Sequence, residues 1–590
     1  MENNGSTVNI LKESPDFNHS SIDLSNDSKN ESKEKTKTVF SPFLDILCNK
    51  YVINIVIFVI ITSHAIWATV YFIKNTDYLD WDAFNETTPK GYGLMVILYL
   101  IYVYSLIYYI LIKPYILPKT RKLVWIPATE VLRKIRYGPI IFYVAILAIT
   151  LAYLGYDTRD NQRRLIPLLG LAVFLATGFI FSANHRYVPW HTVAWGIILQ
   201  FIFGFLTIRW EIGRNVLATF SDHVNTFLDY GMEAAAFTYG DFLVNDQQVF
   251  AFRALSVIFF IGFVVNLLYY YGLMQKFVNM LGEFLQYFMG TTICESVNSV
   301  AVAFVGMSEG PMMLRPYLKY LTDSELHSMM LAGFASVSGS TFAAYISYGA
   351  RAQDLITASI MSAPSALCFS KLLYPETEEV KIKKKDVHMV SIEYSSAMDA
   401  ASKGASDAFH LIAAIISGVT ATLAFVYFIN GVLTWFGILV GFTGEHAWTL
   451  ELIAGKIFIP VAWIMGVEWD ECEKVGQLIG IKTMVNEFVA FSRLKSLNLS
   501  ARSRIIATYA ICGFSNPGSI GILISTMAAL VPEKQENVTR LVFRAFVGGA
   551  LVCFMTACIA GLLMTDEAIS DNSSSSNRTL NFLSNSTTLL

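Results

Sequence analysis

Long apolar stretches alternate with short polar ones through most of the chain. Eleven of these stretches approach the roughly 20 residues that an α-helix needs to cross a bilayer, and they lie at 51–73, 92–112, 138–156, 165–183, 191–208, 252–273, 326–347, 354–373, 408–430, 503–530 and 541–564. Residues 209–250 and 274–289 mix apolar and polar positions in the manner of helices that lie along the membrane interface. The pattern predicts an all-α polytopic membrane protein with about eleven transmembrane helices.

The composition supports this prediction and sets the N-terminus apart. The chain of 590 residues is 54% hydrophobic and 15% charged, whereas a soluble domain carries about 25% charged residues. Residues 1–40 are rich in Asn, Ser, Lys and Glu and have no apolar face, so we expect a disordered cytoplasmic tail there. The 7 cysteines and 9 histidines lack metal-ligand spacing, and no basic stripe indicates a nucleic-acid partner.

The charges of the loops predict the orientation. Residues 113–136 hold seven basic residues, whereas the preceding loop is acidic. Positively charged loops stay in the cytoplasm, so the N-terminus is expected there, and eleven spans then place residues 566–590 outside. The two predicted outer segments carry glycosylation sequons at Asn85, Asn572, Asn577 and Asn585. We therefore expect a multi-pass glycoprotein of the plasma membrane.

Two stretches, 290–316 and 455–495, fit no clean span and resemble each other. Cys294-Glu295-x-Val297 is followed by Glu309 and then Arg315, and the same residue types recur 178 positions later at Cys472-Glu473-x-Val475, Glu487 and Arg493. Each copy leads into a span with a small-residue break, "GFASVSGS" from Gly333 and "GFSNPGS" from Gly513. Inverted repeats with broken helices are typical of secondary transporters, which bind substrate between the repeats.

Glu309 and Glu487 take equivalent positions in these two repeats. A carboxylate in an apolar stretch is costly unless it is paired, protonated or facing a ligand, and a helix break inside a membrane must line a cavity or hold a ligand. Pro517 removes a backbone donor within the second break. We expect a polar ligand site, to which the hydroxyls of a ribose are suitable donors. The alternative is that each glutamate pairs with the arginine six residues later.

The first repeat contains "GMSEG" at Gly306–Gly310, which matches the G-x-S-x-G elbow of hydrolases. The second repeat has Asn486 in the place of Ser308, and the nearest downstream histidine, His327, begins a predicted span. We therefore expect no enzyme. A channel or a receptor is a further alternative, but the polar residues concentrate at the breaks rather than along full spans, which favours a transporter.

From about residue 165 to 565 the chain resembles the concentrative nucleoside transporters. The resemblance lies in stretches such as "GMSEGPMMLRPYL", "SELHSMMLAGF", "IGIKTMVNEFVAF" and "YAICGFSNPGSIG". It implies a homotrimer that imports nucleosides by cation symport, in which two re-entrant hairpins and two broken helices move in an elevator-like way against a scaffold. Residues 41–160 look like the three-helix extension of animal members.

The resemblance also implies a domain organisation. Scaffold and interfacial helices take 161–289, the first transport repeat 290–375, a cytoplasmic loop and scaffold helix 376–450, the second transport repeat 451–565 and the outer tail 566–590. The nucleobase is expected at the first hairpin tip and the ribose at the second repeat. The implied substrate-binding residues are Met307, Ser308, Glu309 and Thr341 for the base, and Glu487, Phe514, Asn516 and Ser519 for the ribose.

Met307 departs from the family pattern, which has Gln at this position of the tip. A Gln amide offers a donor and an acceptor to a pyrimidine edge, whereas Met offers polarizable packing. Gly306-Met307 resembles the purine-preferring members. Purine nucleosides such as adenosine, guanosine or inosine are therefore the expected substrates, with broad selectivity as the alternative.

Val302 is the second departure, because sodium-coupled members have Asn four residues before the tip glycine. The other implied sodium ligands are present, namely the carbonyls of Val305 and Val337 and the hydroxyl of Ser336. Asn298, one helical turn earlier, is a candidate replacement.

Sodium and protons therefore both stand as the coupling ion, and no other cofactor is implied. Protons would act through Glu309 or Glu295. The loss of the Asn also leaves a transport-inactive homologue as an alternative.

Overall fold

The computed structural model describes residues 50–75, parts of 95–103, 138–382 except Asp160, and 394–565 except 445–446. The expectations for the tail 1–40, for most of the span 92–112, for the basic segment 113–136 and for Asn85, Asn572, Asn577 and Asn585 lie outside these residues. The chain divides into two units, Met1–Val131 and Leu132–Leu590. In the first, α2 (Lys50–Asn75) coincides with the predicted span 51–73.

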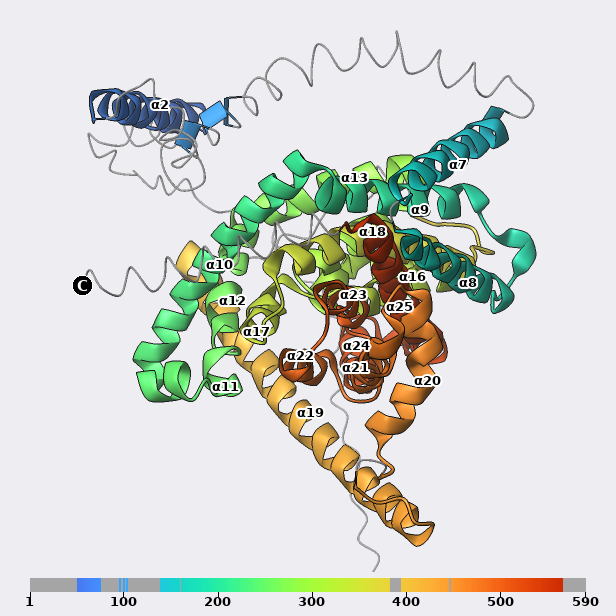
Figure 1. Cartoon of the computed structure of the whole chain (residues 1–590). Coiled ribbons are helices and arrows are strands. Elements are labelled where there is room, and N and C mark those ends of the chain that lie inside the picture. Colours follow the sequence, from blue (N-terminus) through green and yellow to red (C-terminus); the bar gives the residue numbers. More distant parts are fainter. Residues whose placement is uncertain are drawn as a thin grey trace, which may run out of the picture. The chain divides into compact units, whose positions relative to one another are not determined.

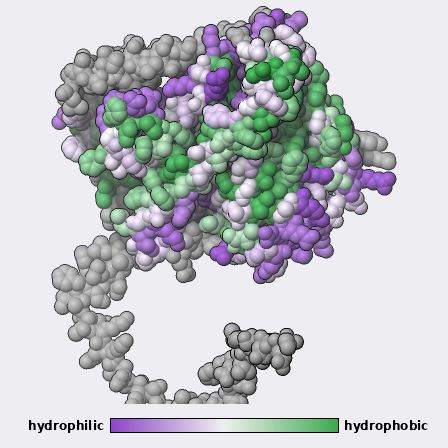
Figure 2. Space-filling view, turned by 90° about the horizontal axis from the view of Figure 1, so that it is seen from below, coloured by the Kyte–Doolittle hydropathy of each residue, from purple (hydrophilic) through white to green (hydrophobic). Residues whose placement is uncertain are grey.

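The described part of the second unit is entirely helical (Figure 1). Six of its helical stretches are long and apolar enough to cross a membrane: Gln162–Ile180, Trp190–Arg209, Phe250–Tyr270, Ala352–Leu373, Ala397–Leu439 and Pro532–Leu563. They overlap six of the predicted spans, and α7 (Gly138–Asp157) overlaps a seventh. In Figure 2, hydrophobic residues cover much of the face seen, while hydrophilic residues gather toward its edges. This distribution suits a protein embedded in a bilayer.

α19 (Ala397–Leu439) is much longer than the predicted span 408–430. Its 43 residues extend over about 65 Å, twice the hydrocarbon thickness of about 30 Å. The helix begins early because the Ser396 hydroxyl accepts a hydrogen bond from the Asp399 N–H and caps it. α19 packs along α12 (Val257–Tyr270), and its C-terminal part projects from the bundle in Figure 1. Only 11% of its most apolar stretch is buried.

The two segments predicted to be amphipathic contain continuous helices. α10 (Glu211–Tyr239) covers most of 209–250, and α13 (Leu273–Met289) matches 274–289. The buried residues of α13, Val278, Gly282, Leu285 and Met289, recur at helical spacing. One face of this helix therefore packs on the bundle while the other is free.

Each repeat forms two helices joined by a tight turn and then a broken helix. In the first repeat α14 (Ile293–Phe304) is followed by α15 (Glu309–Met312), and the broken helix comprises α16 (Asp323–Ala335) and α17 (Phe342–Ser347). In the second, α20 (Leu450–Ile464) packs against α21 (Cys472–Met484), α22 (Glu487–Ser496) follows the turn, and α23 (Ala501–Ile511) and α24 (Pro517–Leu530) form the broken helix. The predicted spans 326–347 and 503–530 are thus interrupted at the small-residue segments.

The two breaks touch each other in the interior. The Phe514 N–H donates to the Ser336 carbonyl over 3.2 Å. Behind them, α25 (Gln535–Leu563) presents Cys553, whose Sγ lies 3.6 Å from the Ala335 oxygen and 3.4 Å from the Cys512 oxygen. A Cβ at Gly513 would lie 3.0 Å from the Phe334 oxygen, so the absence of a side chain permits the crossing. The irregular backbone of both repeats therefore meets at one place.

Candidate functional site

A cavity lies where the two turns, the two breaks and one face of α19 meet. All eight predicted substrate-binding residues line it, namely Met307, Ser308, Glu309, Thr341, Glu487, Phe514, Asn516 and Ser519. They come from four separate segments of the chain, two in each repeat, so the tertiary fold brings together what the two repeats supply. The lining is apolar on the α19 side and polar at the turns and breaks.

The turn of the first repeat presents Glu309 at the start of α15. Gly306 has a φ of +127°, which L side chains rarely adopt, and a Cβ there would lie 2.7 Å from Glu309 Oε2. The backbone N–H groups of Ser308 and Glu309 lie where they favour the charged form of the Glu309 carboxylate. Ser308 and Glu309 are half-buried, and Met307 is buried. The turn thus supports a carboxylate through its own backbone and keeps it open to the cavity.

The turn of the second repeat holds Glu487 through side chains. Glu487 Oε2 accepts a hydrogen bond from Asn516 Nδ2 at 2.7 Å, and Oε1 accepts from the Tyr345 hydroxyl at 3.3 Å. Asn516 Oδ1 in turn accepts from the Ser519 N–H at 2.9 Å and caps α24. Glu487 is 2% exposed. The carboxylate and the amide are therefore fixed relative to each other before any ligand binds.

The alternative pairing of each glutamate with its own arginine is wrong. No ion pair of the described residues joins Glu309 to Arg315 or Glu487 to Arg493. Both arginines are exposed, because the short helices after the turns direct them away from the cavity. Neither arginine therefore neutralises the carboxylate of its repeat, and both carboxylates line the cavity.

One wall of the cavity is formed by α19, which the sequence did not indicate. Six residues of this helix line it at helical spacing, Leu411, Ala414, Ile415, Gly418, Val419 and Thr422. Small residues at every third or fourth position were the available signal. That signal does not distinguish a cavity wall from a helix-packing face, which uses the same residue types.

The predicted ion position lies beside the first turn, at the C-terminal end of α14. Val302 is fully buried and contributes methyl groups that face Gly310. The Val305 carbonyl accepts a hydrogen bond from Ser338 Oγ at 2.7 Å, and the Ser336 hydroxyl bonds the Ala332 carbonyl at 3.0 Å. Carbonyl and hydroxyl oxygens at a half-helix C-terminus suit a hard monovalent cation. The oxygens of this segment fit such an ion, and Ser338 offers one that the sequence-based ligand set did not include.

Asn298, the candidate replacement for the missing amide, engages only its amide nitrogen in a hydrogen bond. It is fully buried, and its Nδ2 donates to the Met329 carbonyl at 3.2 Å. It does not line the cavity. Its Oδ1 has no hydrogen-bond partner among the described residues and lies 3.0 Å from where a Cβ on Gly310 would stand, next to Val302. Asn298 therefore stays a candidate for the missing oxygen ligand.

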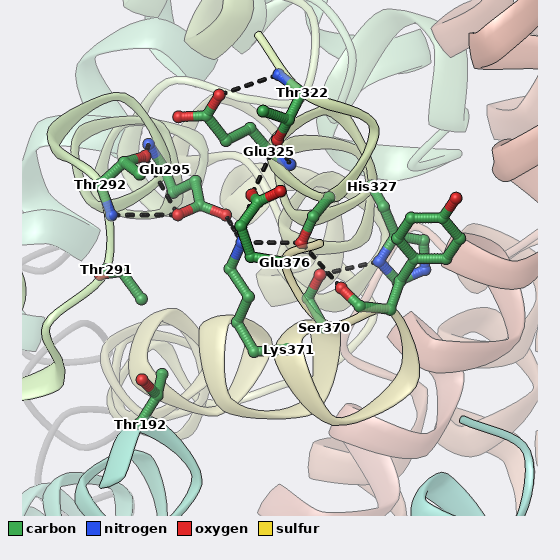
Figure 3. Close-up of polar contacts among 12 residues, drawn as sticks. Thr192, Thr291, Thr292, Glu295, Thr322, Glu325, His327, Ser370, Lys371 and Glu376 are labelled. Carbon is green, nitrogen blue, oxygen red and sulfur yellow. Dashed lines mark hydrogen bonds and ion pairs between the residues drawn. The ribbon is translucent and has the colours of Figure 1, made fainter. Parts of the chain in front are cut away.

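Glu295 lies at the opposite end of α14, in a separate polar cluster (Figure 3). Its carboxylate pairs with Lys371 at 2.5 Å and accepts from the Thr292 N–H in a capping box. Lys371 also approaches Glu376 at 3.5 Å and donates to Ser324. The cluster joins the ends of α14, α16 and α18 (Ala352–Leu373). Glu295 is thus engaged away from the cavity.

Two helix breaks that meet at a polar cavity within a bundle of apolar helices are the construction of a secondary transporter. Three family models cover most of this bundle: "Na+ dependent nucleoside transporter N-terminus" at residues 169–242, "Nucleoside recognition" at 251–352 and "Na+ dependent nucleoside transporter C-terminus" at 354–561. The chain belongs to the concentrative nucleoside transporter family. Its relatives are transporters rather than enzymes, so the elbow interpretation of "GMSEG" does not hold.

Curated relatives agree with this membership. The chain is 40% identical over 441 residues to sodium/nucleoside cotransporter 2 of Rattus norvegicus, covering 72% of this chain and 66% of the relative. It is 41% identical over 429 residues to sodium/nucleoside cotransporter 1 of Oryctolagus cuniculus, covering 70% and 64%. Solute carrier family 28 member 3 of Homo sapiens is 39% identical over 442 residues, covering 72% and 63%. The chain thus spans slightly less than two thirds of the length of these relatives.

Solved structures share the fold. CNTnw in an inward-facing substrate-bound state matches with a TM-score of 0.64 and 35% identity, over 68% of this chain and 98% of that one. A CNTnw variant in an outward-facing state matches with a TM-score of 0.65 over the same shares. The chain is therefore a multi-pass membrane protein with the fold of a known transporter.

Proposed function

We propose that this protein imports nucleosides across the plasma membrane by sodium symport, with purine nucleosides as preferred substrates. The observation that carries the proposal is the cavity in which Glu487 and Asn516 face the Met307–Glu309 turn. A nucleoside has one polyhydroxylated end and one flat heteroaromatic end, and the cavity has a fixed polar side and an adaptable side.

The ribose hydroxyls suit the second repeat. Ionised carboxylates accept hydrogen bonds more strongly than neutral groups do, and Glu487 offers two oxygens next to the Asn516 amide and the Ser519 hydroxyl. Because Asn516 and Tyr345 already hold Glu487 in place, little side-chain entropy is lost on binding. This side of the cavity would bind the ribose through its hydroxyls, independently of the base.

The nucleobase suits the first turn and the apolar face of α19. Met307 gives a polarizable contact without a fixed donor and acceptor pattern, while Ser308 and Glu309 supply polar groups at the edge. A larger purine ring gains more from such packing than a pyrimidine does. The preference for purines follows from this turn, with broad selectivity as the alternative.

For the ion, sodium is favoured because the family and its relatives are sodium-dependent. Val305, Ser336, Val337 and Ser338 would hold it at the end of α14. A bound cation there would compensate the negative end of the helix dipole and order the turn that carries Glu309. Ion and substrate binding would be coupled through that ordering.

The proposal includes an elevator-like movement of both repeats against α12 and α19 in a homotrimer. The contact of α12 with α19 and the long exposed surface of α19 support a separate scaffold. The N-terminus would lie in the cytoplasm and the C-terminus outside, with Asn85, Asn572, Asn577 and Asn585 available to glycosylation.

Uptake of labelled adenosine and uridine into oocytes tests the function. Each nucleoside is offered with sodium or choline, at neutral and at acidic pH. Saturable, sodium-dependent uptake that is faster for adenosine supports the proposal. Acid-stimulated uptake without sodium would replace sodium by protons, faster uridine uptake would remove the purine preference, and no saturable uptake under either gradient would indicate a transport-inactive homologue.

A further inference from the structure

A buried lysine in the second repeat, Lys482, has no acidic side chain within ion-pair distance among the described residues, although its charge acts on the Glu487 carboxylate from farther away. The described residues include three buried lysine or arginine side chains, Arg164, Lys371 and Lys482. Arg164 pairs with Asp157 at 2.6 Å and Lys371 with Glu295 at 2.5 Å. No ion pair of the described residues involves Lys482. Burying an ammonium group costs several kcal/mol in general, so this position calls for an explanation.

Lys482 lies in the last turn of α21 and reaches the second break. It is 0% exposed, its Nζ donates to Ser515 Oγ at 2.5 Å, and the same nitrogen lies 5.9 Å from the centre of the Phe554 ring. The C-terminal end of a helix carries partial negative charge from its free carbonyls. The ammonium therefore sits at a helix end that favours a cation, next to a hydroxyl of the irregular backbone.

In the sequence repeat, this contact takes the position that is equivalent to the predicted ion position of the first half. The offset of 178 relates Lys482 to Phe304, the last residue of α14. Counting back from the Gly-Ser pair that ends each break, Ser515 takes the place of Ser336, the serine whose hydroxyl is an implied sodium ligand. In one half a helix end and a serine form the predicted ion position, and in the other half a helix end and a serine hold an ammonium.

We propose that Lys482 is a tethered cation that takes, in the second repeat, the place of the coupling ion in the first, and that it positions the ribose-binding side chains. The inference rests on the proposed nucleoside transport. Lys482 bonds Ser515, the next residue is Asn516, and Asn516 bonds Glu487 at 2.7 Å. A permanent cation would keep this chain of contacts formed throughout the transport cycle, whereas the first turn is ordered only when its ion binds.

The test measures how strongly binding depends on the ribose hydroxyls. Full-length protein is purified in detergent with sodium, and the equilibrium binding of adenosine is compared with that of 2′,3′-dideoxyadenosine. A site built around hydrogen bonds to a hydroxyl discriminates strongly against an analogue that lacks it, so we expect wild-type protein to prefer adenosine by about 100-fold or more. In Lys482→Met the preference should fall below about 5-fold, mainly because adenosine binds less tightly.

Two further variants serve as rescue and control. Lys482→Arg keeps a cation and should retain most of the preference. Lys456→Met removes a lysine that is 60% exposed and pairs with Glu473 on the neighbouring helix surface, and it should behave as wild type. A merely structural lesion would weaken both ligands equally and leave their ratio unchanged. The ratio therefore reports on positioning rather than on overall stability.

The outcomes are distinct. A Lys482→Met protein that elutes as a single species and keeps the wild-type ratio overturns the inference alone. Wild-type protein that binds neither nucleoside contradicts the proposed function and the inference with it. Where Lys482→Met does not fold, Ser515→Ala removes only the hydroxyl that receives the ammonium. An unchanged ratio in Ser515→Ala would overturn the inference, and a ratio lowered several-fold would support it.

Discussion

Glu309 and Glu487 stand at the same position of two sequence repeats and face one cavity, yet the protein holds them differently. Glu309 is half-buried and is supported by the backbone of its own turn. Glu487 is fully buried and is bonded by Asn516 and Tyr345. The two copies of a duplicated motif thus differ in the residues that surround them, and these surroundings give each copy a different role. One copy is preorganised for the constant part of a ligand, and the other stays adaptable for the part that varies.

The same contrast appears beside the two turns. In the first repeat the carbonyl and hydroxyl oxygens of Val305 and Ser338, which hydrogen-bond each other, are of the kind that suits a mobile cation. In the second repeat a lysine supplies the positive charge covalently. A site with one fixed and one exchangeable cation would have one half that is always ordered and one half that responds to the ion gradient.

The largest effect is expected when the preorganised half is broken at its centre. Glu487→Gln keeps the shape of the side chain but replaces a charged acceptor by a neutral amide beside the Asn516 amide. Because hydrogen bonds to charged groups are worth about twice those to neutral ones, adenosine uptake should fall by about 100-fold or more. The measurement is initial uptake at low adenosine concentration. Glu473→Gln alters a partly exposed glutamate of the same repeat that lies away from the cavity and pairs with Lys456, and this variant should transport normally. Normal transport by Glu487→Gln would remove the role assigned to Glu487.

A somewhat smaller loss is expected at the residue that fixes Glu487. Asn516→Ala removes the 2.7 Å bond to Glu487 and the side-chain cap of α24, and an N-cap alone contributes about 1 kcal/mol. Uptake of adenosine should fall by about 10- to 50-fold. Asn516→Asp tests the geometry, because it preserves the cap but places two carboxylates together. Asn516→Asp should therefore transport poorly even though the start of α24 stays capped. Normal transport by Asn516→Asp beside impaired transport by Asn516→Ala would show that only the cap matters.

These two residues also show how far the sequence alone reaches. The apolar runs predicted most long helices, and the repeat together with the resemblance identified eight residues that all line the cavity. The length of α19 was missed because Asp399, Lys403 and Asp407 interrupt the apolar run, although the Ser396 cap lets the helix start before them. The α19 wall, Ser338 and Lys482 depend on which segments meet in space, and a spacing along one segment does not contain that information.

A substitution in the first turn should change the preference between bases without affecting the ribose side of the cavity. Met307→Gln adds a donor and an acceptor that match a pyrimidine edge and leaves the ribose contacts intact. The ratio of uridine to adenosine uptake should rise by about 5- to 10-fold. Competition between the two labelled nucleosides in one assay measures the ratio directly. An unchanged ratio with normal total uptake would place base selectivity elsewhere, with the α19 wall as the next region to test.

The smallest effect is expected at the ion position. Val302→Asn replaces buried methyl groups by an amide whose oxygen is a suitable ligand for a cation. Tighter sodium binding should lower the sodium concentration for half-maximal uptake by about 3- to 10-fold, as expected when one ligand of an ion site is gained. The comparison variant Val302→Thr offers a hydroxyl at nearly constant volume and should give an intermediate shift. A sodium dependence that does not move in either variant would mean that position 302 does not face the ion.

If the two repeats work together as proposed, they couple the transport of a nucleoside to the movement of a cation down its gradient. Reconstitution of the purified protein into sealed liposomes, with a sodium gradient directed inward and labelled adenosine outside, tests it most directly. The account predicts that internal adenosine rises above the external concentration and falls back when an ionophore dissipates the sodium gradient. Equilibration without accumulation, with or without the ionophore, would contradict it and would indicate an uncoupled pathway instead.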